Sequence, residues 1–161
     1  MNETLQTLVN GLTYEGEMLD SVIGYALIAL SLAPYLLIPS QEPGRDSRGW
    51  IVCLTIVAIL QVTVWFTVPV VGVSLVWCAM GGYLLMDYSR GNMSRSRKRQ
   101  LLAILALVTA LMGIVYCAVA FPIITTIAHI SAVLVGISLF LGVKYLGDRL
   151  RNTRHFQARR N

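Results

Sequence analysis

The sequence predicts an all-α membrane protein, a single domain built as a bundle of about five transmembrane helices. Of its 161 residues, 56% are hydrophobic and only 13% are charged, whereas a soluble domain carries about 25% charged residues. The mean hydropathy is +0.67, and the apolar residues form long uncharged runs. Because lipid leaves no water to satisfy the backbone, such runs must be helices. This composition excludes a soluble cytosolic domain, a disordered chain and a nucleic-acid-binding module.

The predicted spans are separated at prolines. The first is an apolar stretch that ends at Pro39. The next run, from Gly49 to Met86, has no charged residue; as one helix it would be about 57 Å long, nearly twice the roughly 30 Å hydrocarbon core. It must fold back, and we expect the break at Pro69–Gly72. A second overlong run is interrupted at Phe121-Pro122. The predicted spans are residues 21–39, 50–68, 72–88, 101–120 and 122–144.

The positive charges predict the orientation of these spans. All 13 Lys and Arg residues lie in the loops 40–50 and 89–100 or from Lys144 onward. With five spans, these regions share one side of the membrane, and the positive-inside rule makes that side cytoplasmic. The acidic N-terminal segment 1–19 is then outside, and the basic tail 145–161 is cytoplasmic. We expect an integral protein of the plasma membrane whose basic regions set topology and contact anionic lipid.

One ionisable residue, His129, lies well inside a predicted span. Such a residue is costly in lipid and indicates a functional site. Counted from the inner end of its span at Lys144, His129 lies about 8 Å below the outer boundary of the hydrocarbon core. Ser74, counted from Asp87 in the third span, lies about 10 Å below the same boundary. The two residues are therefore predicted at nearly the same depth.

Both residues begin a stripe of small residues. Cys78 and Gly82 follow Ser74 at helical spacing, and Ala132 and Gly136 follow His129. Such stripes let membrane helices approach closely. If the two stripes face each other, the hydroxyl and the imidazole come within hydrogen-bond reach, and a serine beside a histidine base is a minimal activated nucleophile. The alternative is that these residues serve only helix packing and interhelical hydrogen bonding.

The two stretches that carry these residues resemble motifs of the rhomboid family of intramembrane serine proteases. Residues 72–83, GVSLVWCAMGGY, are similar to the family's nucleophile helix with its G-x-S-G motif. Residues 128–136, AHISAVLVG, are similar to its A-H-x-x-G-x-x-x-G motif. The resemblance covers about residues 50–147. It implies that Ser74 is the nucleophile and His129 the general base, with Gly72, Ala132 and Gly136 at the family's small positions.

The sequence also departs from the rhomboid pattern. Leu75 replaces the glycine after the serine, and Cys78 stands where many members have a tyrosine that packs on the histidine. The family has six core helices, and its first has no counterpart here. The His and Asn that help to bind the oxyanion in the family are missing from the span 21–39. Gln61, at nearly the predicted depth of Ser74, is the candidate oxyanion or substrate donor; its alternative role is an interhelical hydrogen bond.

The predicted function is a rhomboid-like serine endopeptidase, a hydrolase whose Ser74–His129 dyad cleaves transmembrane proteins near the outer face. Two alternatives stay open: an inactive rhomboid-like protein that binds transmembrane clients, and a non-enzymatic membrane subunit or small transporter. The expected partners are a transmembrane substrate or client and membrane lipid, without nucleic acid. No cofactor or metal is expected, because the cysteines lack ligand spacing and one intramembrane histidine is a poor metal site.

Overall fold

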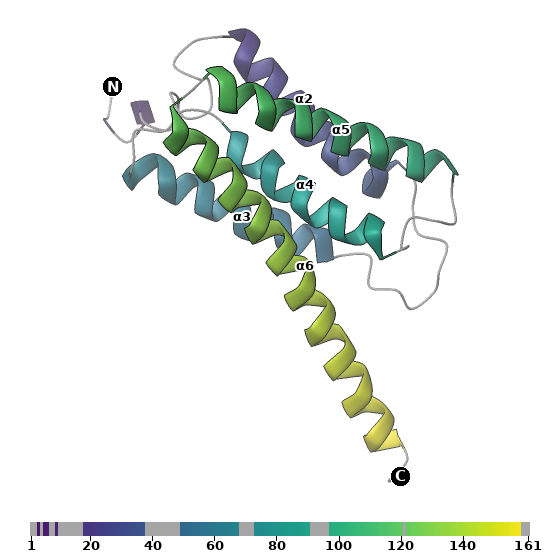
Figure 1. Ribbon diagram of the computed structural model, residues 1–161. Coiled ribbons are helices and arrows are strands. Elements are labelled where there is room, and N and C mark those ends of the chain that lie inside the picture. The colour runs from purple at the N-terminus through teal and green to yellow at the C-terminus, as the bar shows by residue number, and fades with distance from the viewer. Residues whose placement is uncertain are drawn as a thin grey trace.

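The computed structural model describes residues 3, 5, 6, 9, 18–37, 49–67, 73–90, 97–120 and 122–158. Within these ranges the protein is all-α and contains no strand. Five helices follow one another along the described chain (Figure 1). They are α2 (Met18–Leu36), α3 (Gly49–Thr67), α4 (Ser74–Ser89), α5 (Arg97–Ala120) and α6 (Ile123–Ala158).

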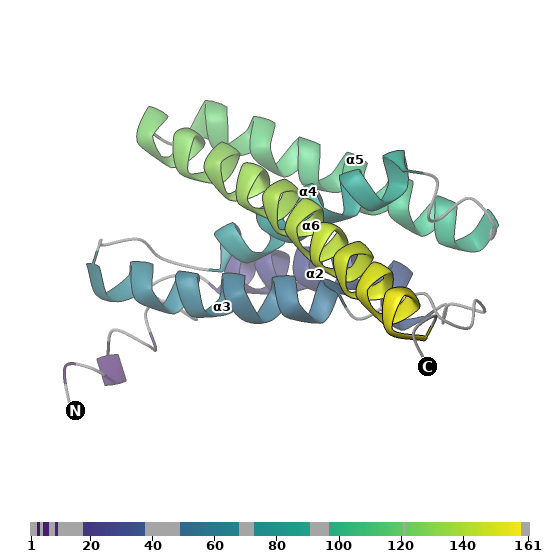
Figure 2. The same ribbon diagram turned by 90° about the horizontal axis from the view of Figure 1, so that it is seen from below.

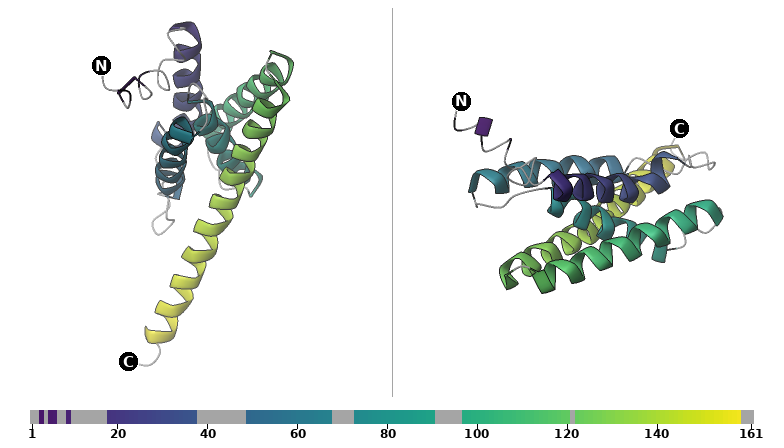
Figure 3. Two further views of the ribbon diagram at one scale, coloured as in Figure 1. Left: turned by 90° about the vertical axis from the view of Figure 1, so that its left-hand side faces the viewer. Right: turned by 90° about the horizontal axis from the view of Figure 1, so that it is seen from above.

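Successive helices alternate in direction. α2, α4 and α6 run one way through the bundle, and α3 and α5 run the other way (Figures 1 and 3). α4 and α6 therefore begin at the same end of the bundle, where α3 and α5 finish. α4 lies between one layer made of α2 and α3 and a second layer made of α5 and α6 (Figure 2). Every residue of α4 from Val76 to Leu84 is buried as a result.

The predicted breaks between helices are confirmed. α3 ends at Thr67 and α4 begins at Ser74 in the opposite direction, and residues 68–72, with Pro69 and Gly72, lie outside the described residues. Pro122 directly precedes α6, where its carbonyl oxygen accepts a hydrogen bond from the Thr125 N–H at 2.9 Å. Proline favours such a place because it lacks the N–H that a helix interior needs.

Two helices extend more than a turn beyond the predicted spans. α6 does not end near residue 144 but continues to Ala158, so that much of the segment 145–161 is helical. The basic residues end the apolar run, but Lys, Arg and Leu are good helix formers and no proline follows. α5 likewise begins at Arg97, inside the basic loop, rather than at residue 101. Most of the segment 1–19 and residues 38–48 lie outside the described residues.

The outer surface of the bundle is strongly apolar. Large hydrophobic side chains such as Val119 and Ile123 are exposed on α5 and α6, and soluble monomers rarely expose wide apolar patches. Two stretches are long and apolar enough to cross a membrane, Arg97–Tyr116 and Ile123–Gly147. The apolar parts of α2 and α3 are shorter, at Val22–Leu36 and Gly49–Val64.

α4 and α6 pack backbone against backbone at two glycines. A Cβ atom added at Gly82 would collide with the carbonyl group of Val133. A Cβ atom added at Gly136 would collide with the carbonyl group of Ala79. Small residues are what such close approach of membrane helices requires. The absence of side chains at these two positions therefore sets the distance between α4 and α6.

A cluster of aromatic rings lies toward the end of the bundle opposite to the start of α4. Tyr35 stacks on Trp50 with ring centroids 5.8 Å apart and meets Tyr83 edge-on at 6.2 Å. Tyr83 in turn meets Phe140 edge-on at 5.1 Å. The four rings come from α2, α3, α4 and α6, so they join four helices at one level. Offset and edge-on pairs of this kind stabilise a fold beyond their buried area.

We expect Gly136→Ala to lower the free energy of unfolding by about 1–3 kcal/mol, the usual cost of overpacking. The backbone of Ala79 blocks the new methyl group, and a backbone cannot turn aside as a side chain can. Gly142→Ala is the matched control on the same helix, because a Cβ atom there meets nothing within 4 Å. Thermal unfolding followed by circular dichroism measures both. Equal melting temperatures for the two variants would contradict the close packing of α4 on α6.

Candidate functional site

The two residues of the predicted dyad lie at the same end of the bundle. Ser74 is the first residue of α4, and His129 lies in the second turn of α6, which begins at that end. The imidazole of His129 is only 3% exposed, whereas Ser74 is half-buried. This end of the bundle thus holds a buried histidine and a more accessible serine at a helix start.

The tautomer of His129 follows from its hydrogen bond. Nδ1 lies 2.6 Å from the carbonyl oxygen of Thr125, one turn earlier in α6. A carbonyl oxygen can only accept, so Nδ1 carries the proton and donates it. The lone pair of the neutral ring is then on Nε2, which can accept a proton from another group. The helix backbone therefore holds the imidazole in the form that a general base needs.

Trp77 packs beside the imidazole of His129. This contact was not predicted from the sequence. The ring centroid of Trp77 lies 6.0 Å from that of His129, at an interplanar angle of 39°, and the indole is buried. Gly113 of α5 makes room for the indole, since a Cβ atom there would lie 2.8 Å from Trp77 Cη2. Sequence comparison with the rhomboid motif drew attention to Cys78, but it is Trp77 that packs on the imidazole. The one sequence feature that could have indicated this contact is the position of an aromatic residue three residues after Ser74.

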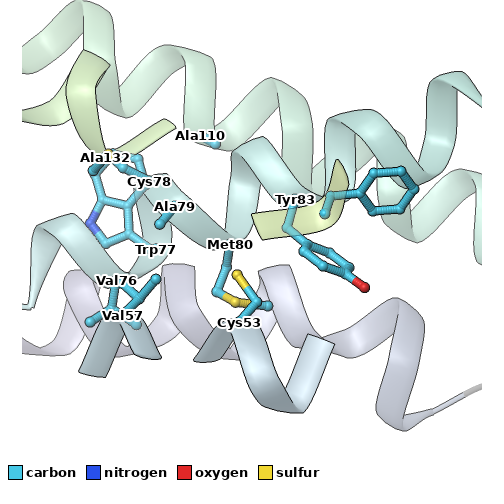
Figure 4. Close-up of a cluster of buried hydrophobic side chains, with 11 residues drawn as sticks. Cys53, Val57, Val76, Trp77, Cys78, Ala79, Met80, Tyr83, Ala110 and Ala132 are labelled. Carbon is cyan, nitrogen blue, oxygen red and sulfur yellow. The ribbon is translucent and has the colours of Figure 1, made fainter. Parts of the chain in front are cut away.

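The remaining small residues of the two stripes line the interface between α4 and α6. Cys78 and Ala132 are buried in the main hydrophobic cluster (Figure 4). Gly82 and Gly136 are the two points of backbone contact. Ser74 lies one turn before Cys78 and Trp77, at the start of α4. Gly72 lies outside the described residues.

The start of α4 presents backbone N–H groups that have no acceptor within the helix itself. Val73 is the N-cap residue and makes no side-chain capping hydrogen bond. Its carbonyl oxygen accepts a hydrogen bond from the Val76 N–H at 3.1 Å, which closes the first turn. The earlier N–H groups of a helix have no intrahelical acceptor and carry a partial positive charge. The first turn that contains Ser74 can therefore bind a negatively charged oxygen.

Gln61 of α3 is the third polar residue at this end. It is only 2% exposed, and neither its Oε1 nor its Nε2 atom has a hydrogen-bond partner within the described structure. Buried polar groups are almost always paired, so this amide needs an explanation. It lies on the same face of α3 as Cys53 and Val57, which pack against α4.

Comparison with known proteins finds no relative of this chain. No protein-family model matches the chain, and no curated protein or solved structure matches it either. Within the described ranges, no group of three or more His, Cys, Asp or Glu residues is placed to hold a metal ion. The chemistry of the site therefore rests on the side chains of Ser74, His129, Trp77 and Gln61.

Trp77→Ala should lower the free energy of unfolding by about 3–5 kcal/mol, as truncation of a buried tryptophan usually does. The reason is the cavity left between α4, α5 and α6. Leu111→Ala is the control, because Leu111 is 62% exposed on α5 and its truncation should change the stability by less than about 0.5 kcal/mol. Denaturant unfolding in detergent measures both variants. Similar losses for both would show that the indole is not part of a packed core.

Proposed function

We propose that the protein is a rhomboid-like intramembrane serine endopeptidase with a Ser74–His129 dyad. The observation that carries this proposal is the buried imidazole of His129. Its Nδ1–H donates to the Thr125 carbonyl, which puts the lone pair of the neutral ring on Nε2, at the end of the bundle where α4 begins with Ser74. A buried histidine held in this form meets what a catalytic base requires.

The reaction follows from these groups. His129 Nε2 takes the proton from the Ser74 hydroxyl while Oγ attacks a substrate carbonyl carbon. The N–H groups at the start of α4 stabilise the oxyanion of the tetrahedral intermediate. The protonated imidazole then gives its proton to the leaving amine, and an acyl-enzyme forms. Water attacks the acyl-enzyme with His129 again as base. The Thr125 carbonyl holds the imidazole and stabilises the imidazolium in both steps.

The proposal includes a five-span bundle with the catalytic end facing outward. The alternation of five helices supports it, and so does the apolar outer surface. The basic residues at the start of α5, Arg97, Lys98 and Arg99, lie at the end opposite to Ser74 and His129. By the positive-inside rule that end is cytoplasmic. Cleavage then occurs in the outer half of the membrane, in a protein of the plasma membrane.

A specific observation favours a second candidate, an inactive rhomboid-like protein that binds transmembrane clients. Leu75 follows Ser74 directly, and its side chain packs against the main hydrophobic cluster. A bulky residue at this position narrows the space beside the nucleophile. In this second function the α4–α6 interface would remain as a scaffold, and Ser74 would not be activated.

A fluorophosphonate probe, which reacts only with activated serines, distinguishes these functions. We expect the reconstituted wild-type protein to be labelled, and Ser74→Ala and His129→Ala to lose labelling. The expected loss is at least about 10³-fold, as for removal of a member of a serine-protease catalytic unit. Labelling is measured by in-gel fluorescence.

The control for this labelling is Ser138→Ala. Ser138 is an exposed serine of α6 whose hydroxyl donates to the Leu134 carbonyl oxygen at 2.9 Å, and this variant should be labelled like the wild type. Folded wild-type protein without labelling would overturn the protease proposal and leave the client-binding function.

The five-span arrangement predicts that the two ends of the chain lie on opposite sides of the membrane. Alkaline phosphatase should be active when fused before residue 1, and green fluorescent protein should fluoresce when fused after residue 161. The reciprocal fusions should both be silent. If both ends report the same side, the number of spans is even and the five-span arrangement is wrong.

A further inference from the structure

The face of α6 that packs on α4 continues past the end of α4. Val133 and Gly136 lie at the two backbone contacts with α4, and Phe140 meets Tyr83 of α4 edge-on at 5.1 Å. These α6 positions are three and four residues apart, as one face of a helix requires. α4 ends at Ser89, whereas α6 runs on beyond the other helices (Figures 1 and 3).

This face changes from apolar to basic where α4 ends. Arg90, the C-cap residue of α4, lies with its guanidinium carbon 6.0 Å from the centroid of the Phe140 ring. At the same spacing of three and four residues, the next positions of the face are Lys144, Gly147, Arg151 and Arg154. We call Arg90 together with Lys144, Arg151 and Arg154 the basic face.

The chain has too few acidic residues at this end to balance its positive charge. All 13 Lys and Arg residues follow residue 38. Half of the 8 acidic residues precede it, and those that follow it are Glu42, Asp46, Asp87 and Asp148. Like charges on one helix face repel each other. The charge balance therefore favours an anionic partner from outside the chain.

The depth of the basic face indicates where that partner lies. The stretch of α6 that is apolar enough to cross a membrane ends at Gly147. Arg151 and Arg154 lie about 6 and 10 Å further along the helix axis, and the headgroup layer on each side of the hydrocarbon core is about 5–8 Å thick. Lys144, just inside the apolar stretch, can extend its ammonium group toward that layer. Because α6 is one continuous helix, these positions follow each other at fixed intervals from the core outward.

We propose that the basic face of α6 binds the headgroups of anionic phospholipids in the inner leaflet. Arginine guanidinium groups pair with phosphate oxygens through two parallel hydrogen bonds, and the cytoplasmic leaflet carries the anionic lipids. The site is at the opposite end of α4 from Ser74. The inference therefore goes beyond the protease function and holds whether or not the serine is activated.

The test is photo-cross-linking from Gly147, which lies between Lys144 and Arg151 on the same face. A Cβ atom there meets nothing within 4 Å, so Gly147→p-benzoylphenylalanine has room. The full chain is placed in nanodiscs of phosphatidylcholine with a minority of phosphatidylglycerol, and lipid adducts are identified by mass spectrometry. We expect the adducts to be enriched in phosphatidylglycerol at least about tenfold over the bulk ratio, since each nearby base is worth about fivefold.

Gly142→p-benzoylphenylalanine is the matched control. A Cβ atom at Gly142 also meets nothing within 4 Å, but this position lies on the opposite face of α6 and inside the apolar stretch. The two lipids have the same acyl chains there, so its adducts should follow the bulk ratio. Equal ratios at the two glycines would overturn the proposal.

Two arginines separate a specific face from a general attraction to basic residues. Arg149 and Arg151 differ little in depth, but their positions lie on nearly opposite faces of the helix. In the Gly147 cross-linking protein, Arg151→Gln should lower the phosphatidylglycerol enrichment about fivefold, and Arg149→Gln should leave it unchanged. Equal losses would show that only the net charge of the segment matters, and the proposal would fail.

The same experiment tests other occupants of the basic face. Adducts of Gly147→p-benzoylphenylalanine with the chain itself would show that a segment of this protein covers the face. Added polyglutamate that replaces the lipid adducts would assign the face to a soluble acidic partner. Either result would overturn the lipid assignment. Unchanged melting temperatures confirm that the variants compared are folded.

Discussion

The architecture depends on the contact between the backbones of α4 and α6. Gly82 and Gly136 have no side chain at the places where a Cβ atom would strike the opposite helix. The two helices can therefore come close enough for α4 to be enclosed on every side, which is why Val76 to Leu84 are all buried. The same approach brings the start of α4 and the second turn of α6 to one end of the bundle. Without it, Trp77 and His129 would not meet.

The two ends of the enclosed helix differ in chemistry. At its C-terminal end, Tyr35 stacks on Trp50, Tyr83 meets Tyr35 and Phe140 edge-on, and Arg99 Nε donates to the Pro34 carbonyl at 3.0 Å. Its N-terminal end holds the candidate residues His129, Ser74 and Gln61. His129 is oriented by its own helix, whereas the amide of Gln61 is unpaired within the described structure.

Several features of the candidate site were predictable because they are local. The position of a residue along its helix follows from counting from the helix end, so Ser74 and His129 could be expected at one end of the bundle before any packing was known. The small residues at 82 and 136 could be identified as packing residues by spacing. The role of Trp77 could not be predicted, because it depends on the space that Gly113 leaves on a third helix. The unpaired state of Gln61 also depends on its neighbours and has no signature in the sequence.

The sequence by itself determined the all-α class, the order of the helices and the positions of the breaks. These are properties of uncharged run length and of proline, which act within one segment of chain. Only the tertiary structure decided which side chains meet, and that α6 continues through the basic segment to Ala158. The physical reason is that these helices are apolar on nearly all sides. Hydrophobic periodicity then does not distinguish the face that packs from the face that is exposed, and close contact alone makes that choice.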